Sequence, residues 1–230
     1  MSFYDEWQKA TEEKQSGEAF IRQFLDYDPG SMESLVNGEK ADALVAIRQL
    51  LAVPIASFVA AINHPYEYKA KDIFQFSKLE DATDTLCNIL EYEDPMLSYE
   101  EAGQKLVHAT KQYANIKYGE NHAKTAAMLT LVTIKRVDDR KCNVVRISPL
   151  GSVMTMLSRE DKNEVIRRLA IRNPFLKTLI FHAKNGEASY VEDVSKALSG
   201  QTIIRRKHNN EIIMNLVLQD EPIRERIRWQ

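Results

Sequence analysis

The amino-acid sequence predicts a mainly helical protein with one short β-hairpin, and three observations support this prediction. Apolar residues recur at helical spacing through most of the 230 residues. Two short runs rich in β-branched residues, 133–137 and 144–148, flank a polar turn at 138–141, as in a hairpin. The succession of helices before this hairpin also recurs in the last third of the chain. The length and a hydrophobic content of 44% suffice for globular domains that bury a core.

The first 72 residues should form a helical N-terminal region. Phe3 and Trp7 are the first of several apolar residues at helical intervals, and a later helix starts near Glu39. Pro54 should break that helix, because proline has no amide hydrogen to donate. The broad apolar face of this region would pack on the rest of the chain or on a partner. We therefore assign dimerisation or partner docking to residues 1–72.

Residues 73–157 should form a first domain in which three helices precede the hairpin. The first helix ends near Pro95, a capping box at 98–101 opens a short second helix, and the third is expected over 121–132. A helix, a short capped helix, a helix and a hairpin follow one another in the winged helix, a helix-turn-helix variant. We therefore predict a winged-helix domain with the hairpin as its wing.

Residues 158–230 repeat much of this order. Helices are expected over 160–169 and 174–183, a capping-box spacing at 189–192 opens a short helix, and a third helix follows over 203–219. Only the hairpin is missing or truncated, and the last residues form a brief basic tail. The prediction is a second, winged-helix-like domain in tandem with the first; one irregular helical domain is the alternative.

Short stretches within residues 74–219 resemble a known family. They are 119–132, 145–151 with Ser148-x-x-Gly151 after a strand, 173–175, and Thr202 with Arg205 and Arg206. Together they resemble the tandem winged-helix modules that accompany bacterial restriction endonucleases and related defence or ATPase-associated proteins. The resemblance implies DNA binding or a specificity role and no fixed catalytic set. The polar run at 205–208 departs from the pattern, which usually turns apolar soon after its arginines, and no nuclease domain is evident.

The overall net charge of −2 hides a difference between the two halves of the chain. Residues 1–116 carry 10 lysines and arginines against 20 aspartates and glutamates, which gives −10. Residues 117–230 carry 21 basic against 13 acidic residues, which gives +8. Such asymmetry indicates a basic binding surface beside an acidic portion. The alternative is that the basic helices simply present solvated faces.

Two helices and the hairpin carry the candidate DNA-binding residues. Asn121, Lys124 and Thr125 share one face near the start of the expected third helix, where recognition helices touch base edges. The polar run at 205–210 would mostly contact phosphates, and a solvated surface is the alternative for both helices. The predicted DNA-binding residues are Lys117, Asn121, His122, Lys124, Thr125, Lys135, Arg136, Arg140, Lys141, Arg205, Arg206, Lys207, His208 and Asn209.

No catalytic residue, metal site or cofactor is predicted. The five histidines are scattered, and Cys87 and Cys142 form neither a metal-binding pattern nor a disulfide scaffold. Glu67-Tyr68-Lys69 is a lone E-x-K, the tail of the signature of metal-dependent nucleases. Such nucleases also need an acidic residue on a preceding strand, and the segment before Glu67 has a helical pattern instead.

Three function hypotheses follow, and all assume a cytoplasmic protein without membrane contact. The longest apolar stretch, 50–62, is too short to span a bilayer, and the acidic N-terminus is unlike a signal peptide. The first hypothesis is a non-enzymatic protein that binds double-stranded DNA as a homo-oligomer. It would be a specificity or regulatory component of a bacterial restriction or defence system, with an effector nuclease or ATPase subunit as a partner. The second is a protein–protein adaptor whose basic half pairs with acidic partners, and the third is a divergent metal-dependent nuclease.

Overall fold

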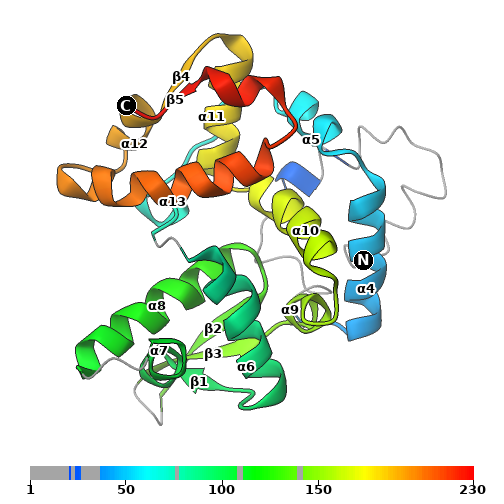
Figure 1. Ribbon diagram of the computed structural model, residues 1–230, viewed down its shortest axis with the longest axis vertical. Helices are drawn as coiled ribbons and strands as arrows, with labels where there is room; N and C mark the ends of the chain where they lie inside the picture. Colours follow the sequence, from blue (N-terminus) through cyan, green and yellow to red (C-terminus); the bar gives the residue numbers. More distant parts are fainter. Residues whose placement is uncertain (1–20, 22–23, 27–36, 76–77, 108–110, 139–141) are drawn as a thin grey trace.

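Figure 1 shows the computed structural model of the chain, which describes residues 21, 24–26, 37–75, 78–107, 111–138 and 142–230. Most of the described residues are helical, beside a three-stranded antiparallel sheet and one pair of short parallel strands. The predicted mainly helical class with a hairpin is therefore confirmed. Among the described residues no single helix is long and apolar enough to cross a membrane, although Lys40–Ala52 and Ile55–Ala61, bent by 80°, pass that test together.

The N-terminal helices pack their apolar faces on the rest of the chain. They are α4 (Lys40–Ala52) and α5 (Ile55–Ala61). The chain breaks between them at Pro54, as expected. Leu50 and Phe58 are fully buried in a core cluster that also contains residues of the later helices. In the described part of this region, the apolar face therefore packs on the rest of the chain. Phe3 and Trp7 lie outside the described residues.

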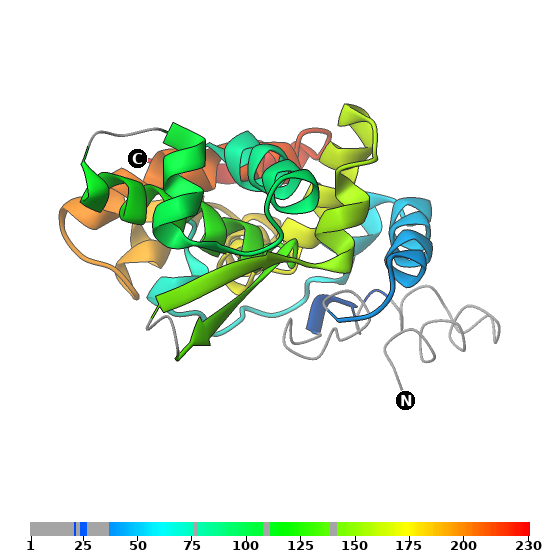
Figure 2. The same cartoon turned by 90° about the horizontal axis from the view of Figure 1, so that it is seen from below.

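The middle of the chain combines helices with the antiparallel sheet. Its elements are η2 (Ala70–Asp72), η3 (Asp81–Thr85), α6 (Leu86–Tyr92), β1 (Leu97–Ser98), α7 (Tyr99–Val107), α8 (Gln112–Met128), β2 (Val132–Val137), β3 (Cys142–Ile147) and α9 (Pro149–Met154). The strand order is β1-β3-β2, with Leu97 opposite Val145, and Figure 2 shows the β2–β3 hairpin on one face of the helical body. The expected capping box is confirmed, because Ser98 and Glu101 each accept the other's backbone amide through their side chains.

The helix expected over 121–132 is wrong at both ends, because α8 begins nine residues earlier and ends four residues earlier. Its polar first half has little apolar periodicity and packs closely on α7. A β-carbon on Gly103 of α7 would lie 1.8 Å from the carbonyl oxygen of Asn115. A β-carbon on Gly119 of α8 would lie 1.9 Å from the carbonyl oxygen of Tyr99. The two glycines thus let the helices touch backbone to backbone, and this contact supports the early start of α8.

Replacing Gly119 with alanine should lower the free energy of unfolding by about 1–3 kcal/mol, because the new methyl group must push α7 away from α8. Alanine favours an isolated helix over glycine by about 1 kcal/mol, so helix propensity alone predicts the opposite sign. Thermal unfolding followed by circular dichroism measures the change. Ala114→Gly, at an exposed site of the same helix, is the control and should lose only about 1 kcal/mol. A Gly119→Ala melting temperature at or above that of the wild type would contradict the close packing.

The last part of the chain follows a similar order of elements without a hairpin. Its elements are α10 (Arg159–Ile171), α11 (Pro174–Asn185), β4 (Ala188–Ser189), α12 (Tyr190–Ser195), α13 (Gln201–Val217), η4 (Pro222–Arg226) and β5 (Ile227–Arg228). The helix start expected near 189–192 is confirmed, because Ser189 Oγ accepts the amide of Glu192. The expected basic tail is corrected: after η4 the chain returns as β5 and pairs in parallel with β4, with Ala188 opposite Ile227.

Cations of α10 and α11 bind the carbonyl groups at the C-terminal ends of other helices. Arg168 Nε donates to the carbonyl of Leu50 at 2.7 Å, near the end of α4, and Arg167 Nε donates to Val217 at 3.3 Å, at the end of α13. The last carbonyls of a helix lack the amide of the residue four positions later, and a nearby cation is favourable. The Leu50 carbonyl also accepts the amide of Val53. Similar contacts to backbone carbonyls join Arg172 to Phe24, Lys177 to Leu25, and Lys184 to Val59, Ala60 and Ile62. Five cations of the basic half therefore stabilise the fold. The positive net charge of this half is for that reason weaker evidence for a basic binding surface.

Candidate nucleic-acid interface

Part of the α8 face chosen from the sequence points into the protein. His122 is 1% exposed and Thr125 is 2% exposed. His122 Nδ1 lies 2.8 Å from the carbonyl oxygen of Tyr118, and the two rings stack. Burial lowers the pKa of His122, which favours the neutral ring. Neither side chain is open to a base edge or a phosphate, because helix packing turns this side of α8 toward the core.

Two of the predicted lysines on α8 share one carboxylate. Lys117 Nζ lies 2.8 Å from Glu120 Oε2, and Lys124 Nζ lies 2.7 Å from Glu120 Oε1. The two lysine side chains remain 51% and 44% exposed. Ion pairs in contact with water contribute little, so either lysine can exchange Glu120 for a phosphate.

The true start of α8 presents side chains that no pattern in the sequence singles out. Tyr113 is 71% exposed, and Gln112 is exposed with its amide donating to Glu100 at 2.8 Å. Recognition helices usually contact bases with residues near their N-terminus. Gln112, Tyr113 and Lys117 therefore occupy the place that had been expected for Asn121, Lys124 and Thr125. No apolar periodicity marks this start, so no local signal could have located it.

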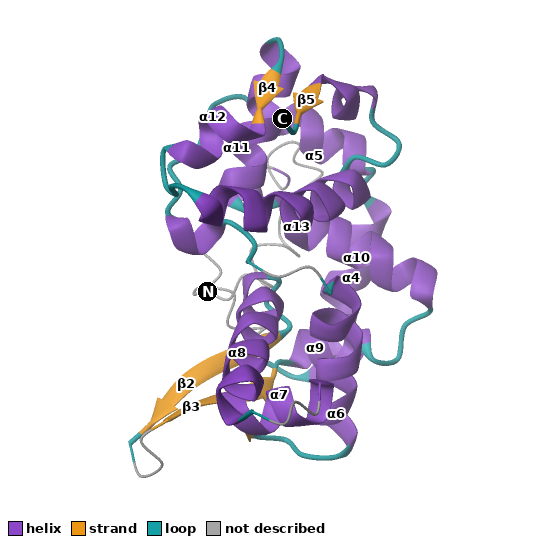
Figure 3. Cartoon of the chain, turned by 60° about the vertical axis from the view of Figure 1, so that its left-hand side comes forward, coloured by secondary structure: helices purple, strands orange, loops and turns teal. Residues whose placement is uncertain are grey.

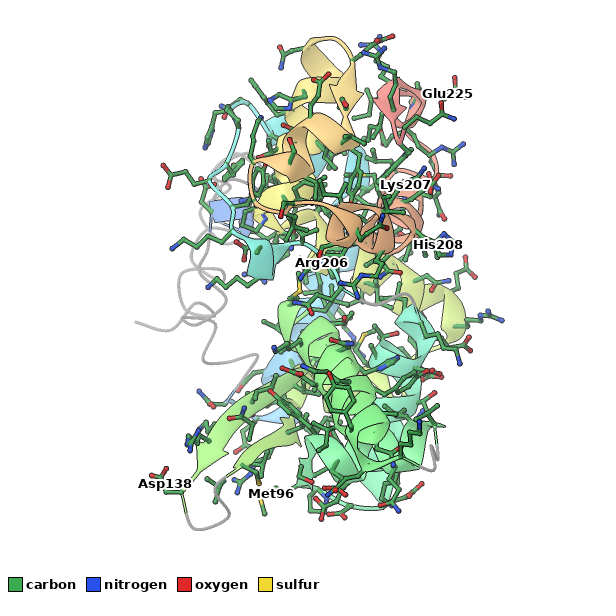
Figure 4. All side chains as sticks on the ribbon, turned by 90° about the vertical axis from the view of Figure 1, so that its left-hand side faces the viewer. Met96, Asp138, Arg206, Lys207, His208 and Glu225 are labelled. Atoms are coloured by element: carbon green, nitrogen blue, oxygen red, sulfur yellow. The ribbon has the colours of Figure 1, made fainter. Side chains whose placement is uncertain are left out.

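The hairpin presents two of its four predicted cations among the described residues. Lys135 and Arg136 are exposed on β2, and Arg136 Nε lies 3.8 Å from Asp138 Oδ1. Figure 3 shows the hairpin projecting beside α8, and Figure 4 labels Asp138 near its tip. Arg140 and Lys141 lie outside the described residues.

The basic run at the start of α13 divides into surface and structural residues. Arg206 Nη1 donates to the carbonyls of Ala70 at 2.6 Å and Ile73 at 3.0 Å, so this arginine holds the segment that leads into the middle of the chain. Arg205 and His208 are exposed and Lys207 is half-buried. Figure 4 shows Arg206 on the side of α13 nearer α8 and Lys207 on the opposite side.

A cleft of about 440 Å³ lies between α8 and α13, which run one above the other in Figure 1. It brings Asn121 of α8 together with residues of the α13 run, although the sequence treated the two helices as separate sites. Its lining residues are Gln75, Asn121, Thr202, Arg205, Arg206, His208 and Asn209. No carboxylate is among these described residues, so the cleft has a positive electrostatic character. Gln75 comes from the segment before the first domain's helices, and nothing in its local pattern indicated a site.

Comparison of the chain with known proteins identifies no counterpart of the cleft or the hairpin. Neither protein-family models, nor curated proteins, nor solved structures match this chain. The resemblance to defence-associated modules therefore has no support beyond the short stretches that suggested it.

A second cavity of about 610 Å³ contains the E-x-K motif. Glu67 and Lys69 lie in a segment without regular structure, and Asp72 Oδ2 accepts the Lys69 amide at 2.8 Å. Lys177 also lines this cavity, and burial lowers its pKa to about 8. Among the described residues no group of three or more histidines, cysteines or carboxylates is placed to hold a metal ion. The geometry therefore gives the nuclease hypothesis no additional support.

Proposed function

We propose that the chain is a double-stranded DNA-binding protein built on tandem winged-helix units. In a winged helix, three helices and a three-stranded antiparallel sheet are arranged so that the third helix can enter the major groove beside the hairpin. The order of η3 and α6, β1, α7, α8, β2 and β3, with sheet order β1-β3-β2, supports this assignment for residues 73–157. In this proposal α8 is the recognition helix and the hairpin is the wing. Residues 158–230 are a second, wingless unit.

The observation that carries the proposal is a set of cations without acidic partners. Within the described part of the chain, Lys135, Arg205 and Lys207 enter no ion pair. Lys135 belongs to the hairpin and Arg205 to α13, the two elements that lie on either side of α8 in Figure 3, whereas Lys207 lies on the side of α13 away from α8. Phosphate contacts supply most of the affinity of such a surface, whereas base edges supply its specificity. Gln112, Tyr113 and Lys117 are the residues that we assign to base edges.

The biological setting that we propose rests on the resemblance found in the sequence. The protein would be a non-catalytic specificity or regulatory component of a bacterial restriction or defence system in the cytoplasm. A homodimer with an effector nuclease or ATPase subunit would fit this role, and residues 1–72 would supply the docking region. Two-fold symmetry would then set the spacing of DNA half-sites.

Two double variants test DNA binding directly. Arg205→Ala/Lys207→Ala and Lys135→Ala/Arg136→Ala should each weaken binding to a duplex by about tenfold. Each should also reduce the slope of log affinity against log salt by up to about 2, because each phosphate contact contributes about 0.9 to that slope. Fluorescence anisotropy of a labelled duplex between low and moderate salt measures both quantities.

The matched control is Arg48→Ala/Arg159→Ala, which removes two exposed cations of α4 and α10. In Figure 1 these helices lie on the other side of the molecule from the start of α13. This control should bind the duplex like the wild type. If the wild type ignores duplex DNA at low salt, or if the control loses as much affinity as the test variants, the proposal is wrong.

A protein–protein adaptor is the second candidate, and one observation favours it. Ile204 is 64% exposed on α13 next to Arg205, so this face offers an apolar contact beside a cation. A partner with an acidic rim around an apolar patch would complement it. Retained partner binding without any duplex binding would select this candidate.

A further inference from the structure

The cleft is lined by an asparagine amide that has no hydrogen-bond partner among the described residues. Asn209 is 4% exposed and lines the cleft, yet its side chain forms no hydrogen bond with any described residue. Its neighbour Asn210, which is fully buried, uses both amide atoms on the backbone of Phe74. Neither amide atom is among the buried polar atoms that lack a hydrogen bond, so the amide reaches the open space of the cleft. Asn209 is therefore a polar group placed to meet something in the cleft.

The other lining groups indicate what that ligand is. Asn121 and Gln75 add two more amides and Thr202 adds a hydroxyl, which suit the polar edge of a flat ring. Arg205 and Arg206 add positive charge, which suits a phosphate. The volume of about 440 Å³ is within the range of about 300–1,000 Å³ typical of small-molecule sites, and is too small for stacked base pairs.

We propose that this cleft binds a single nucleotide, with its phosphate on Arg205 and its base edge on the amide of Asn209. An asparagine amide donates and accepts side by side, which matches the N6 and N7 edge of adenine. We therefore expect a preference for adenine. The nucleotide can be free in solution, or it can be extruded from a bound duplex, as in proteins that take a base out of the stack. Binding of an extruded nucleotide rests on the proposed DNA binding, whereas binding of a free nucleotide does not.

Two arms of one experiment distinguish these sources. In the first, calorimetric titration of the full chain with dAMP, dGMP, dCMP, dTMP and inorganic phosphate should show dAMP binding at least tenfold tighter than phosphate. In the second, a duplex with one adenine opposite an abasic site and 2-aminopurine as the neighbouring base should gain fluorescence when the protein extrudes the adenine and unstacks its neighbour. Asn209→Leu keeps the number of side-chain heavy atoms and removes the amide, so it should reduce either signal at least tenfold.

Asn215→Leu, at an exposed site of the same helix, is the control and should leave both signals unchanged. Asn121→Leu, half-buried on the opposite wall, provides a second variant that decides the question if Asn209→Leu does not fold. A signal in either arm that both leucine variants of the cleft reduce supports the proposal and identifies the source. No signal in either arm, or signals that survive both variants, would overturn it. If the wild type still binds duplex DNA in a salt-dependent way, the proposed DNA binding stands although the nucleotide proposal fails.

Discussion

Replacing Arg168 with alanine is expected to lower the free energy of unfolding by about 3–5 kcal/mol. Its side chain is among the buried residues, at 4% exposure. Nε donates to the carbonyl of Leu50 at 2.7 Å, Nη2 donates to that of Val53 at 2.9 Å, and Nη1 pairs with Glu164 at 2.6 Å. The variant leaves the carbonyls at the end of α4 without this buried cation, and the Glu164 side chain, which is 30% exposed, keeps Arg167 as its partner. Urea unfolding followed by circular dichroism measures the loss.

Arg159→Ala is the matched control, because Arg159 is exposed at the start of the same helix. It should change the free energy of unfolding by no more than about 0.5 kcal/mol. Equal losses in the two variants, or an Arg168→Ala midpoint like that of the wild type, would show that the contacts with α4 do not stabilise the fold.

The pH dependence of stability provides a second readout of the same cluster. Burial alone raises the pKa of Glu164, but hydrogen bonds and charge from Arg168 and Arg167 outweigh burial and hold that pKa below 4.5. A carboxylate with a lowered pKa in the folded state adds stability above its ordinary pKa, and this stability is lost as the pH falls through the lowered value. Between about pH 5 and pH 3 the wild type should therefore lose more stability than Arg168→Ala.

Asn210→Ala is expected to cost about 2–4 kcal/mol, because it leaves two buried backbone groups without partners. Asn210 Oδ1 accepts the amide of Phe74 at 3.2 Å, and Nδ2 donates to the carbonyl of Phe74 at 3.1 Å. Both residues are fully buried. For a chain of this length, calorimetry should record a fall of about 4–16 °C in melting temperature.

Asn215→Ala provides the comparison, since Asn215 is exposed on the same helix. It should melt within about 2 °C of the wild type, which corresponds to less than about 0.5 kcal/mol. A melting temperature of Asn210→Ala that matches this comparison would mean that the segment around Phe74 is held by other contacts.

Features that depend on neighbouring residues could be predicted from the sequence. Pro54 ends a helix because it lacks a donor, and the Ser98 side chain caps the helix that follows it. The Ser148-x-x-Gly151 spacing opens a helix through a hydrogen bond of 2.9 Å between the serine hydroxyl and the glycine amide. Each of these interactions spans only a few residues, so the local pattern contains the information.

The candidate site was predicted less well, because its geometry depends on contacts between distant residues. The sequence pointed to α8 and α13, but spacing alone does not say which face of α8 packs inward. His122 and Thr125 are buried because α8 packs against α7, η3 and β2. Arg206 donates hydrogen bonds to the carbonyls of Ala70 and Ile73, which lie more than 130 residues earlier in the chain.

By itself, the sequence determined the class of the fold, the hairpin, most of the helix starts and the basic charge of the second half. Only the tertiary structure decided which of those basic residues reach the surface. Lys177 binds the carbonyl of Leu25, and Arg168 binds that of Leu50, across separations of 152 and 118 residues. The physical reason is that charge belongs to each residue, whereas its partner, a helix end or a ligand, is chosen by the packing of segments far apart in the chain.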